Sequence, residues 1–306
     1  MNSKNYIKQL KEILEKRNIS QSALASEIGV TFSAFNRWIN KYSTPHKTKL
    51  EKINKLYKEY VYYPEINQEA IKQIIKGSEK FKIKNIYKRI VNNEKLIEDL
   101  LLEHTYNSNA IEGSTFSKRE TEAVIFDHLI IKEKSLIEHL EATNHATVLR
   151  NIFGKKYGQE IDESLIKNLH KDLMQSIRQD AGEYSKYNRA IRGVNIMLTH
   201  PDDIPEELEK LILKWKEIKN KNIHDIAKFH ADFELIHPFG DGNGRVGRLL
   251  MIIQCLSLDY PPVVIENSEK IEYYEVLEYA QTKTEGPLVE FFFSEMKKTR
   301  GILDKY

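Results

Sequence analysis

The spacing of the apolar residues is the strongest constraint on the fold of this chain. From Pro64 onwards they recur mostly three or four positions apart, which places them along one face of an α-helix. Two such rows are Ile71, Ile74 and Ile75, and Leu165, Leu169 and Leu173. Long alternating runs, which would indicate strands, are few, and glycine and proline are scarce outside certain places. The sequence therefore predicts an all-α bundle.

One segment departs from this pattern. Residues 184–198 follow Gly182 and contain Gly193 together with three β-branched residues, Ile191, Val194 and Ile196. Such side chains favour extended backbone, and glycines favour turns. We therefore expect one small β-hairpin within the helical bundle.

Composition and length indicate a soluble globular protein of the cytoplasm. The chain has 306 residues, enough for two or three domains, and 41% of them are hydrophobic and 30% charged. The one cysteine, Cys255, excludes an intrachain disulfide and suits a reducing compartment. The most apolar run, around residues 249–258, falls short of the roughly 20 residues that a membrane span needs. The first residues lack the apolar stretch of a signal peptide, so we expect no membrane partner.

The overall charge of +2 hides two regions of opposite sign. Residues 1–60 hold twelve basic and five acidic side chains, a net charge of +7, which leaves 35 basic and 40 acidic side chains in residues 61–306. The basic character is therefore concentrated in the first fifth of the chain. A boundary is expected near residues 60–64, because Pro64 disfavours helical backbone at Tyr63.

Residues 20–40 have the pattern of two short helices joined by a tight turn. In the first helix Leu24 and Ile28 lie four apart on an inner face, and Gly29 suits the turn that follows. Thr31 is a good N-cap for a second helix whose apolar stripe includes Trp38. This layout resembles the Xre/Cro-type helix-turn-helix family.

That resemblance implies a DNA-binding head whose second helix enters the major groove. The residues that would face DNA are Thr31, Phe32, Ser33, Asn36 and Arg37, and those that would meet phosphates are Lys47, Lys49 and Lys52. Helix-turn-helix domains usually read paired half-sites, so a homodimer is a reasonable expectation. The alternative is a small helical interaction module with a solvated basic face.

Residues 237–248, His-Pro-Phe-Gly-Asp-Gly-Asn-Gly-Arg-Val-Gly-Arg, gather the richest set of chemical groups. Four of the 13 glycines lie here, directly before an apolar helix, where free backbone N–H groups converge on anions. Arg245 and Arg248 lie three apart, so both can project from one side of the first helical turns. Asp241 offers a carboxylate for Mg²⁺, and His237 can accept a proton at pH 7. Together these groups suit phosphoryl-type transfer.

This stretch resembles the signature of Fic-domain proteins, His-x-Phe-x-Asp-Gly-Asn-Gly-Arg-x-x-Arg, at every defined position. The resemblance implies a Fic-type helical bundle with a β-hairpin flap that transfers AMP from ATP to a Ser, Thr or Tyr hydroxyl of a target protein or of itself. His237 would deprotonate the hydroxyl, and Asp241 would hold Mg²⁺. The implied nucleotide-binding residues are Phe239, Gly240, Asp241, Gly242, Asn243, Gly244, Arg245, Arg248, Tyr273 and Gln281. Core packing is an equal alternative for Tyr273.

The position of Gly244 bears on the transferred group. Relatives that phosphorylate their targets carry Lys there, so this loop favours AMP, while phosphocholine transfer stays open.

Residues 108–113, Ser-Asn-Ala-Ile-Glu-Gly, resemble the family's inhibitory motif, Ser/Thr-x-x-x-Glu-Gly/Asn, at Ser108, Glu112 and Gly113. Glu112 would pair with Arg248 in the place of the γ-phosphate. In some relatives this glutamate also supports removal of AMP, so the reaction could run both ways.

The resemblance also divides the chain. The hairpin residues Ile191, Arg192, Gly193 and Val194 match in place the flap that docks the target segment. The implied domains are residues 1–60, the helix-turn-helix; residues 65–140, a helical part with the inhibitory motif at 108–113; and residues 141–306, the catalytic core.

Two other hypotheses compete with this one. The chain could be a transcriptional regulator whose Fic domain only senses nucleotide, although a sensor has no use for His237 as a base. His224, His230 and His237 could form a metal site, but spacings of six and seven residues do not suit a compact ligand pair on one helix.

Overall fold

The computed structural model describes residues 5–155, 160–190 and 196–306, and within them every regular element is a helix. The prediction of an all-α fold is confirmed. The chain divides into two compact units, Met1–Ala70 and Ile71–Tyr306, which we describe separately. No helix in the described ranges combines the length and the apolar character needed to cross a bilayer.

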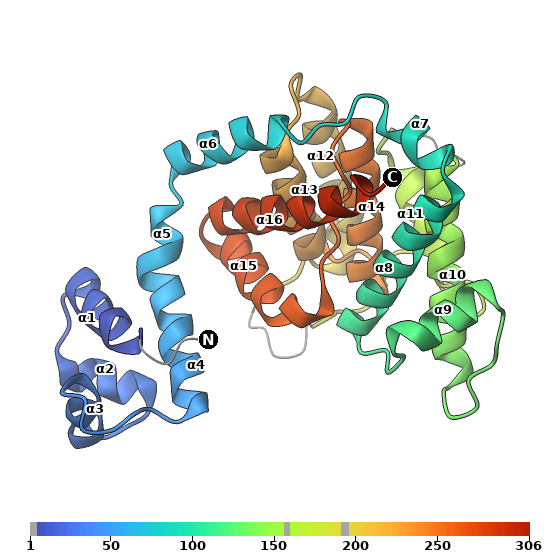
Figure 1. Cartoon of the computed structure of the whole chain (residues 1–306). Coiled ribbons are helices and arrows are strands. Elements are labelled where there is room, and N and C mark those ends of the chain that lie inside the picture. Colours follow the sequence, from blue (N-terminus) through green and yellow to red (C-terminus); the bar gives the residue numbers. More distant parts are fainter. Residues whose placement is uncertain (1–4, 156–159, 191–195) are drawn as a thin grey trace. The chain divides into compact units, whose positions relative to one another are not determined.

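The first unit is a bundle of short helices (Figure 1). Its elements are α1 (Tyr6–Arg17), α2 (Gln21–Ile28), α3 (Phe32–Ile39), α4 (Lys47–Tyr57), the π-helical turn η1 (Lys58–Tyr62) and α5 (Tyr63–Glu65). Side chains from α1 to α4 form one core, with Leu10, Leu24, Phe35 and Ile53 free of solvent contact.

Capping residues fix the turn between α2 and α3. The hydroxyl groups of Ser20 and Thr31 accept hydrogen bonds from the backbone N–H groups of Ala23 (3.1 Å) and Ala34 (3.2 Å). Gly29 ends α2 in the left-handed conformation with φ 79°, which a side chain would disfavour. The predicted N-cap and glycine turn are confirmed.

Pro64 does not end the helical path, so the expectation that it keeps Tyr63 out of a helix is wrong. Tyr63 has φ −60° and ψ −40°, and Pro64 lies in the first turn of α5. The wider π turn η1 precedes the proline, and a first-turn position needs no N–H donor there. The backbone therefore continues as a helix from α4 into α5.

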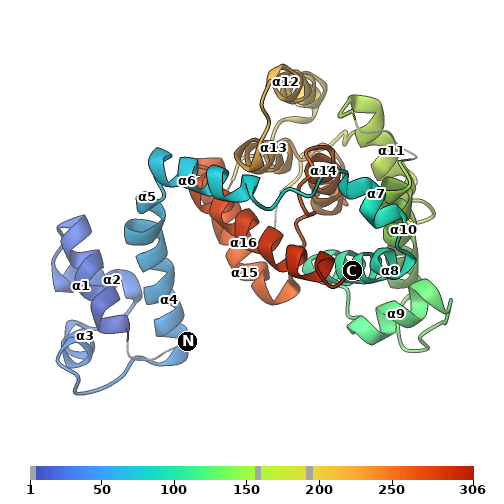
Figure 2. The ribbon, with the colours of Figure 1, turned by 45° about the horizontal axis from the view of Figure 1, so that its top comes forward.

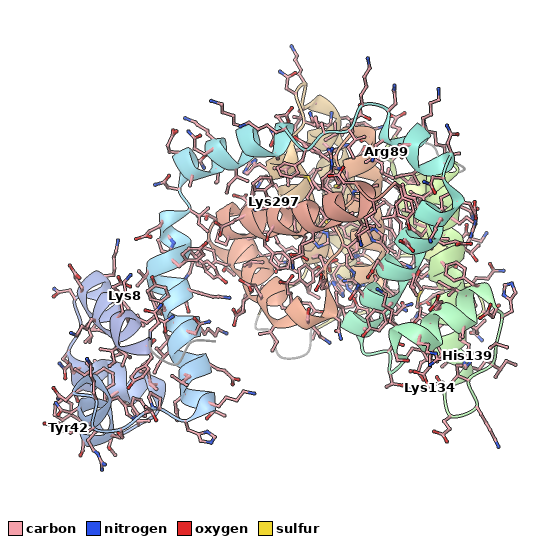
Figure 3. The ribbon with its side chains drawn as sticks, in the orientation of Figure 1. Lys8, Tyr42, Arg89, Lys134, His139 and Lys297 are labelled. Carbon is pink, nitrogen blue, oxygen red and sulfur yellow. The ribbon has the colours of Figure 1, made fainter. Side chains whose placement is uncertain are left out.

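The second unit contains the longer helices, joined to the first through α6 (Gln68–Glu79). Its elements are α7 (Ile86–Val91), α8 (Glu94–Glu112), α9 (Lys118–Phe126), α10 (Leu136–Phe153), α11 (Glu163–Leu173), η2 (Pro201–Asp203), α12 (Ile204–Glu217), α13 (Ile223–Ile236), α14 (Asn243–Ser257), η3 (Asn267–Glu269), α15 (Lys270–Thr282) and α16 (Gly286–Leu303). Arg89 of α7 donates a 2.8 Å hydrogen bond to the carbonyl group of Leu303, which ties α7 to the end of α16 (Figure 3).

Helix α14 is the centre of the second unit. Almost every residue of it is buried, and it packs against α8, α11 and α13. In Figure 2 it lies between α13 and α11. A helix that is buried on almost all sides belongs to the core, and this one carries the glycine-rich loop at its N-terminus. The loop is therefore held by a helix of the core.

The predicted hairpin has no support from the described part of its segment. No residue in 184–190 or 196–198 is in a strand. The backbone N–H groups of Ser185 and Thr199 bond instead to the carbonyl groups of Pro238 (2.9 Å) and Leu235 (3.4 Å). The segment's ends thus pair with the end of α13 and its loop rather than with each other. The flap residues Ile191, Arg192, Gly193 and Val194 lie outside the described residues.

Candidate active site

The glycine-rich loop joins two buried helices, α13 and α14. His237 ends α13 in the left-handed conformation, with φ 50°, and Gly242, with φ 78°, caps the start of α14. The side chain of Asn243 closes the loop, because its oxygen accepts from the N–H of Phe239 and its amide donates to the carbonyl of the same residue, both at 2.8 Å. Local hydrogen bonds therefore shape the loop.

Phe239 anchors this loop in the core and is not among the residues that line the hollow described below. Its side chain is 0% exposed and stacks on the His170 ring of α11, with ring centroids 3.7 Å apart. His170 also accepts from the N–H of Gly182 (2.8 Å) and lies 3.1 Å from the carbonyl oxygen of Asp241. Burial lowers the pKa of His170 to about 4, so the ring is neutral at pH 7. No pattern in the sequence predicted that His170 would support Phe239 and the loop.

Two loop glycines lie very close to the ends of neighbouring side chains. A Cβ atom at Gly240 would fall on the hydroxyl group of Tyr187 and within 2.9 Å of the Arg178 guanidinium. A Cβ atom at Gly244 would fall on Oε1 of Glu112 and within 3.1 Å of Arg248. The absence of a side chain at Gly244 therefore lets Glu112 reach Arg248.

A hollow of about 340 Å³ opens above the N-terminus of α14. The predicted site residues that line it are Glu112, His237, Gly240, Asp241, Gly242, Asn243, Gly244, Arg248, Tyr273 and Gln281. Sequence analysis missed four others, Ala190, Glu234, Leu277 and Glu278, and Tyr274, the neighbour of Tyr273 in the tyrosine pair that the family resemblance implies, also lines the hollow. Residues from α8, α13, α14 and α15 thus converge on one polar space, which is typical of a ligand site.

Arg248 and Glu112 form an ion pair at the wall of this hollow, in which the Arg248 side chain is buried and the Glu112 side chain is 32% exposed. Arg248, 5% exposed, donates from Nη2 to Oε1 of Glu112 at 2.6 Å and to the carbonyl oxygen of Ser108 at 3.0 Å, and its Nε donates to the Ser108 hydroxyl at 2.9 Å. Burial alone would raise the pKa of Glu112, but the charge of Arg248 and its hydrogen bond outweigh burial and hold the pKa below its usual value. Gly113 ends α8 directly after Glu112, with φ 110°.

Arg245 does not share this position, so the two arginines do not project together. Its guanidinium is buried and donates to Glu141 of α10 at 2.6 Å, and it lies 3.8 Å from the Asp241 carboxylate. Arg245 is not among the residues that line the hollow. The three-residue spacing allowed a common direction, but the buried acceptor on α10 draws Arg245 away. Nothing in the local pattern around residue 141 predicted that acceptor.

The His237 ring is oriented for proton acceptance. Its Nδ1 lies 3.2 Å from the carbonyl oxygen of Glu234, which can only accept a hydrogen bond. Nδ1 therefore carries the proton, and Nε2 is left as the acceptor. Burial lowers the pKa of His237, so the ring is neutral at pH 7. A neutral imidazole facing the hollow is suited to act as a general base.

Two of the α15 residues have clear structural partners. Tyr273 is buried, and its hydroxyl group lies 2.8 Å from Nε2 of His230, so it serves core packing as well as the hollow. The amide of Gln281 donates to the carbonyl of Ala231 at 3.2 Å. Both side chains are therefore held in place by α13.

Asp241 is the one predicted Mg²⁺ ligand, and its carboxylate fits that role. The side chain is 56% exposed, lines the hollow and accepts from the N–H of Gly242 at 2.7 Å. Mg²⁺ in nucleotide sites commonly uses one or two carboxylates beside phosphate oxygens and water. The proposed metal site of His224, His230 and His237 has no support, because the described residues contain no group of three metal-binding side chains. The His230 ring instead forms a hydrogen bond with the hydroxyl group of Tyr273.

In the first unit, four of the five predicted DNA-facing residues are exposed. These are Thr31, Phe32, Ser33 and Arg37, whereas Asn36 is half-buried and its side-chain oxygen accepts from Asn40 at 3.0 Å. Lys49 was predicted to meet phosphates, but its ammonium group caps α2 by donating to the carbonyls of Ile28 (3.1 Å) and Gly29 (3.0 Å).

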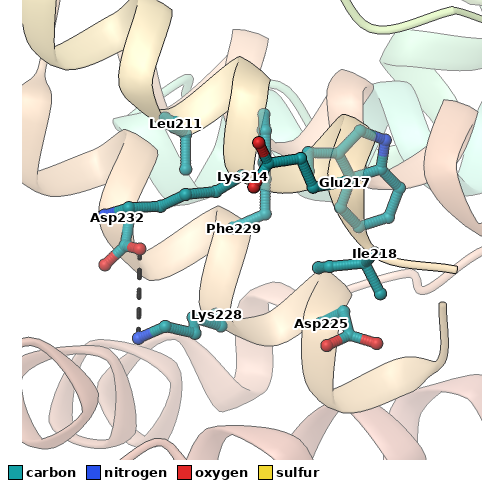
Figure 4. Close-up of a pocket in the computed structure, with 9 residues that line it drawn as sticks. Leu211, Lys214, Glu217, Ile218, Asp225, Lys228, Phe229 and Asp232 are labelled. Atoms are coloured by element: carbon teal, nitrogen blue, oxygen red, sulfur yellow. Dashed lines mark ion pairs between the residues drawn. The ribbon is translucent and has the colours of Figure 1, made fainter. Parts of the chain in front are cut away.

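A second hollow, of about 370 Å³, lies between α12 and α13 (Figure 4). It contains none of the predicted site residues. Its lining residues are Leu211, Lys214, Trp215, Glu217, Ile218, Asp225, Lys228, Phe229 and Asp232. Lys228 and Asp232 approach to 4.0 Å at its edge.

The fold and the site define a helical protein with a glycine-rich loop at a helix N-terminus, and comparison with known proteins places it more closely. Residues 160–255 match the Fic/DOC family, and residues 10–61 match the helix-turn-helix family. The chain therefore carries a Fic domain and a helix-turn-helix domain.

Similar proteins support this assignment. The chain is 30% identical over 212 residues to protein adenylyltransferase Fic of Nematostella vectensis, covering 65% of this chain and 47% of that protein. It is 28% identical over 214 residues to the Drosophila melanogaster protein of the same name, covering 68% of this chain and 42% of that one. The chain thus spans less than half the length of these relatives.

Two solved structures share the fold. Fic-1 from C. elegans superimposes with a TM-score of 0.70 at 18% identity, covering 99% of this chain and 98% of that one. A Fic domain containing signaling protein from Bacteroides thetaiotaomicron gives a TM-score of 0.62 at 23% identity, covering 78% and 96%.

Proposed function

We propose that this protein is an autoinhibited protein adenylyltransferase, which transfers AMP from ATP to a Ser, Thr or Tyr hydroxyl of a target protein or of itself. The observation that carries the proposal is the orientation of His237, whose acceptor nitrogen shares one hollow with Arg248 and the glycine-rich start of α14. The relatives named protein adenylyltransferase Fic support the same chemistry.

In this proposal each part of the hollow has one role. His237 takes the proton of the attacking hydroxyl, while backbone N–H groups at Gly242, Asn243 and Gly244 hold the phosphates at the helix N-terminus. Arg248 binds the γ-phosphate and favours departure of pyrophosphate. Arg245 braces the loop through its contacts with Glu141 and Asp241 rather than contacting phosphate from the hollow.

Mg²⁺ would be held by Asp241, whose exposed carboxylate faces the hollow. When bound, the ion supplies charge neutralisation on the α- and β-phosphates. The remaining catalytic work belongs to the side chains and backbone groups of the loop.

Glu112 inhibits this enzyme by pairing with Arg248, the cation that would otherwise bind the γ-phosphate. A carboxylate bonded to Arg248 at 2.6 Å must leave before a phosphate can take its place. Its removal therefore activates transfer. The same carboxylate can orient a water molecule, so the proposal includes removal of AMP from a modified target as a second reaction.

The test measures transfer of labelled α-phosphate from ATP by the full chain. We expect Glu112→Gly to increase labelling of proteins in a cell lysate and His237→Ala to abolish it in the Glu112→Gly background. His224→Ala, on the same helix but outside the hollow, is the matched control and should retain activity. Equal labelling by wild type and Glu112→Gly would refute the inhibition, and labelling that survives His237→Ala would refute the assigned base.

A second function, DNA binding, is favoured by the exposed face of α3. Phe32, Ser33 and Arg37 are exposed on the helix that enters the major groove in helix-turn-helix proteins. In this second proposal the protein is a transcriptional regulator. The first unit binds DNA as a homodimer, and the Fic domain senses nucleotide. A gel shift should weaken with rising salt and with Arg37→Ala, whereas no shift at low salt would reject DNA as a partner.

A further inference from the structure

A buried carboxyl group, that of Glu234, lies at the hollow and has no role in the proposed reaction. The residue is 5% exposed, and its Oε1 has no hydrogen-bond partner among the described residues. An unpaired charge in such a place is costly, so the neutral acid is favoured at rest. Burial accordingly raises the pKa of Glu234 to about 8.

Gly247 provides the space for this carboxyl group. A Cβ atom at Gly247 would fall on Oε1 of Glu234 and within 3.2 Å of the His230 and Phe233 rings. Unlike Gly240, Gly242 and Gly244, this glycine is not among the residues that line the hollow. The fourth glycine of the cluster therefore accommodates Glu234 rather than an anion.

Glu234 meets the His237 ring through both its backbone and its side chain. The backbone carbonyl lies 3.2 Å from Nδ1, and Oε2 of the carboxyl group lies 3.9 Å from the same nitrogen. The two residues are three apart at the end of α13, so one helical turn sets this geometry. The carboxyl group therefore lies beside the side of the ring that faces away from its proton-accepting nitrogen.

The charged and titratable groups around Glu234 come from four helices. Arg248 of α14 favours its ionised form, and Glu112 of α8 disfavours it. Tyr273 and Tyr274 of α15 interact electrostatically with Glu234, and His230 of α13 and its C-cap residue His237 lie on the same helical segment as Glu234. A positive charge added on the His237 ring would therefore shift the balance toward the carboxylate.

On the basis of the proposed function, we propose that Glu234 is a positioning residue for His237, whose carboxyl group becomes the counter-ion of the ring when the ring takes the target's proton. The target oxygen bonds to the α-phosphorus as the bond to the pyrophosphate oxygen breaks, and the hydroxyl proton moves to Nε2. The charged ring then draws Glu234 into its carboxylate form, and the acid proton leaves to water.

The test compares Glu234→Gln and Glu234→Asp in the full chain carrying Glu112→Gly. Glu234→Gln should lower kcat for AMP transfer by about tenfold or more, leave KM for ATP within about twofold, and move the acid limb of the pH profile to lower pH. Glu234→Asp, which keeps the acid, should recover part of kcat. Asp232→Asn is the control, because Asp232 lies on the same helix and its pKa is also raised by burial, but it lines the other hollow.

A second measurement is independent of activity. Titration of the His237 ring by NMR should give a lower ring pKa in Glu234→Gln than in the parent and no change in Asp232→Asn. Equal ring pKa values in parent and Glu234→Gln, or a loss confined to KM, would overturn the role of Glu234. If the parent transfers no AMP, the proposed function fails, while the ring titration still decides the Glu234–His237 interaction.

Discussion

Helix α13 separates two hollows of similar size and very different chemistry. The hollow beside α12 measures about 370 Å³ and the one at the glycine-rich loop about 340 Å³. In the first, Trp215 and Phe229 pack edge to face, and the charged groups lie at the rim, with Lys228 and Asp232 both partly exposed. In the second, Arg248 and Glu234 are buried and Glu112 is bonded to one of them.

The difference shows that size does not identify the reactive site. Asp232 and Glu234 are only two residues apart, yet the helical period turns one toward α12 and the other toward the loop. Burial raises the pKa of both, but only Glu234 has a buried cation and a candidate base beside it. Convergence of such groups, rather than volume, distinguishes a site for chemistry.

The largest contrast between the hollows should come from their cations. Arg248→Ala removes the side chain that pairs with Glu112 and leaves that carboxylate, which is 32% exposed, without its cation. We expect a loss of about 1–3 kcal/mol in the free energy of unfolding and at least about a hundredfold loss of AMP transfer in the Glu112→Gly background. Urea denaturation and labelled-ATP assays measure the two effects. A stable, active Arg248→Ala protein would remove the distinction between the hollows.

The aromatic wall of the α12 hollow should matter for stability alone. Phe229 is buried and packs on Trp215 with ring centroids 5.5 Å apart. Phe229→Ala should cost about 3 kcal/mol of unfolding free energy because it deletes a core ring. AMP transfer per folded molecule should stay within about twofold of the parent, as judged by activity at a temperature well below the melting point. A selective loss of transfer would show that this hollow also serves the reaction.

The sequence predicted the loop well because its residues act through local geometry. His237, Asp241 and the three glycines that line the hollow lie within eight residues, 237–244, and the cap at Gly242 and the helix start at Asn243 follow from backbone preferences. The inhibitory pair was accessible through a second short motif, with Ser108 and Glu112 four apart on α8. Residues that act within one or two helical turns leave a pattern that spacing can reveal.

Contacts between distant segments left no such pattern. Glu141 reaches Arg245 from 104 positions away, and His170 supports the loop from 71 positions away, so neither partner could be chosen from spacing. Glu234 is different, because it lies three residues before His237, and helical spacing could have found it. Pro64 misled the prediction because its local preference was overridden by a π turn.

The buried acid at the loop should also make stability depend on pH. The pKa of Glu234 is about 8 in the folded protein, whereas in the unfolded chain a glutamate has a pKa of about 4.3. Between these values the folded state binds more protons, so stability falls as pH rises. Glu234→Gln cannot ionise and lacks this part of the decline. Its melting temperature relative to wild type should therefore increase from pH 5 to pH 8. Glu295, whose pKa burial also raises to about 8, contributes equally to both proteins. A difference that does not change with pH would contradict a buried neutral acid.

The smallest effect is expected from the exposed cation of the α12 hollow. Lys228 is 48% exposed and pairs with Glu285 at 2.6 Å and with Asp232 at 4.0 Å, so water screens both interactions. Lys228→Met should change the free energy of unfolding by less than about 1 kcal/mol, and the change should shrink further in high salt. AMP transfer in the Glu112→Gly background should remain within about twofold. Arg248 and Lys228 would then mark the two extremes of one comparison, a buried cation beside a candidate base and a solvated one beside an aromatic wall. A Lys228→Met protein as impaired as Arg248→Ala would mean that the α12 hollow holds a charged ligand of its own.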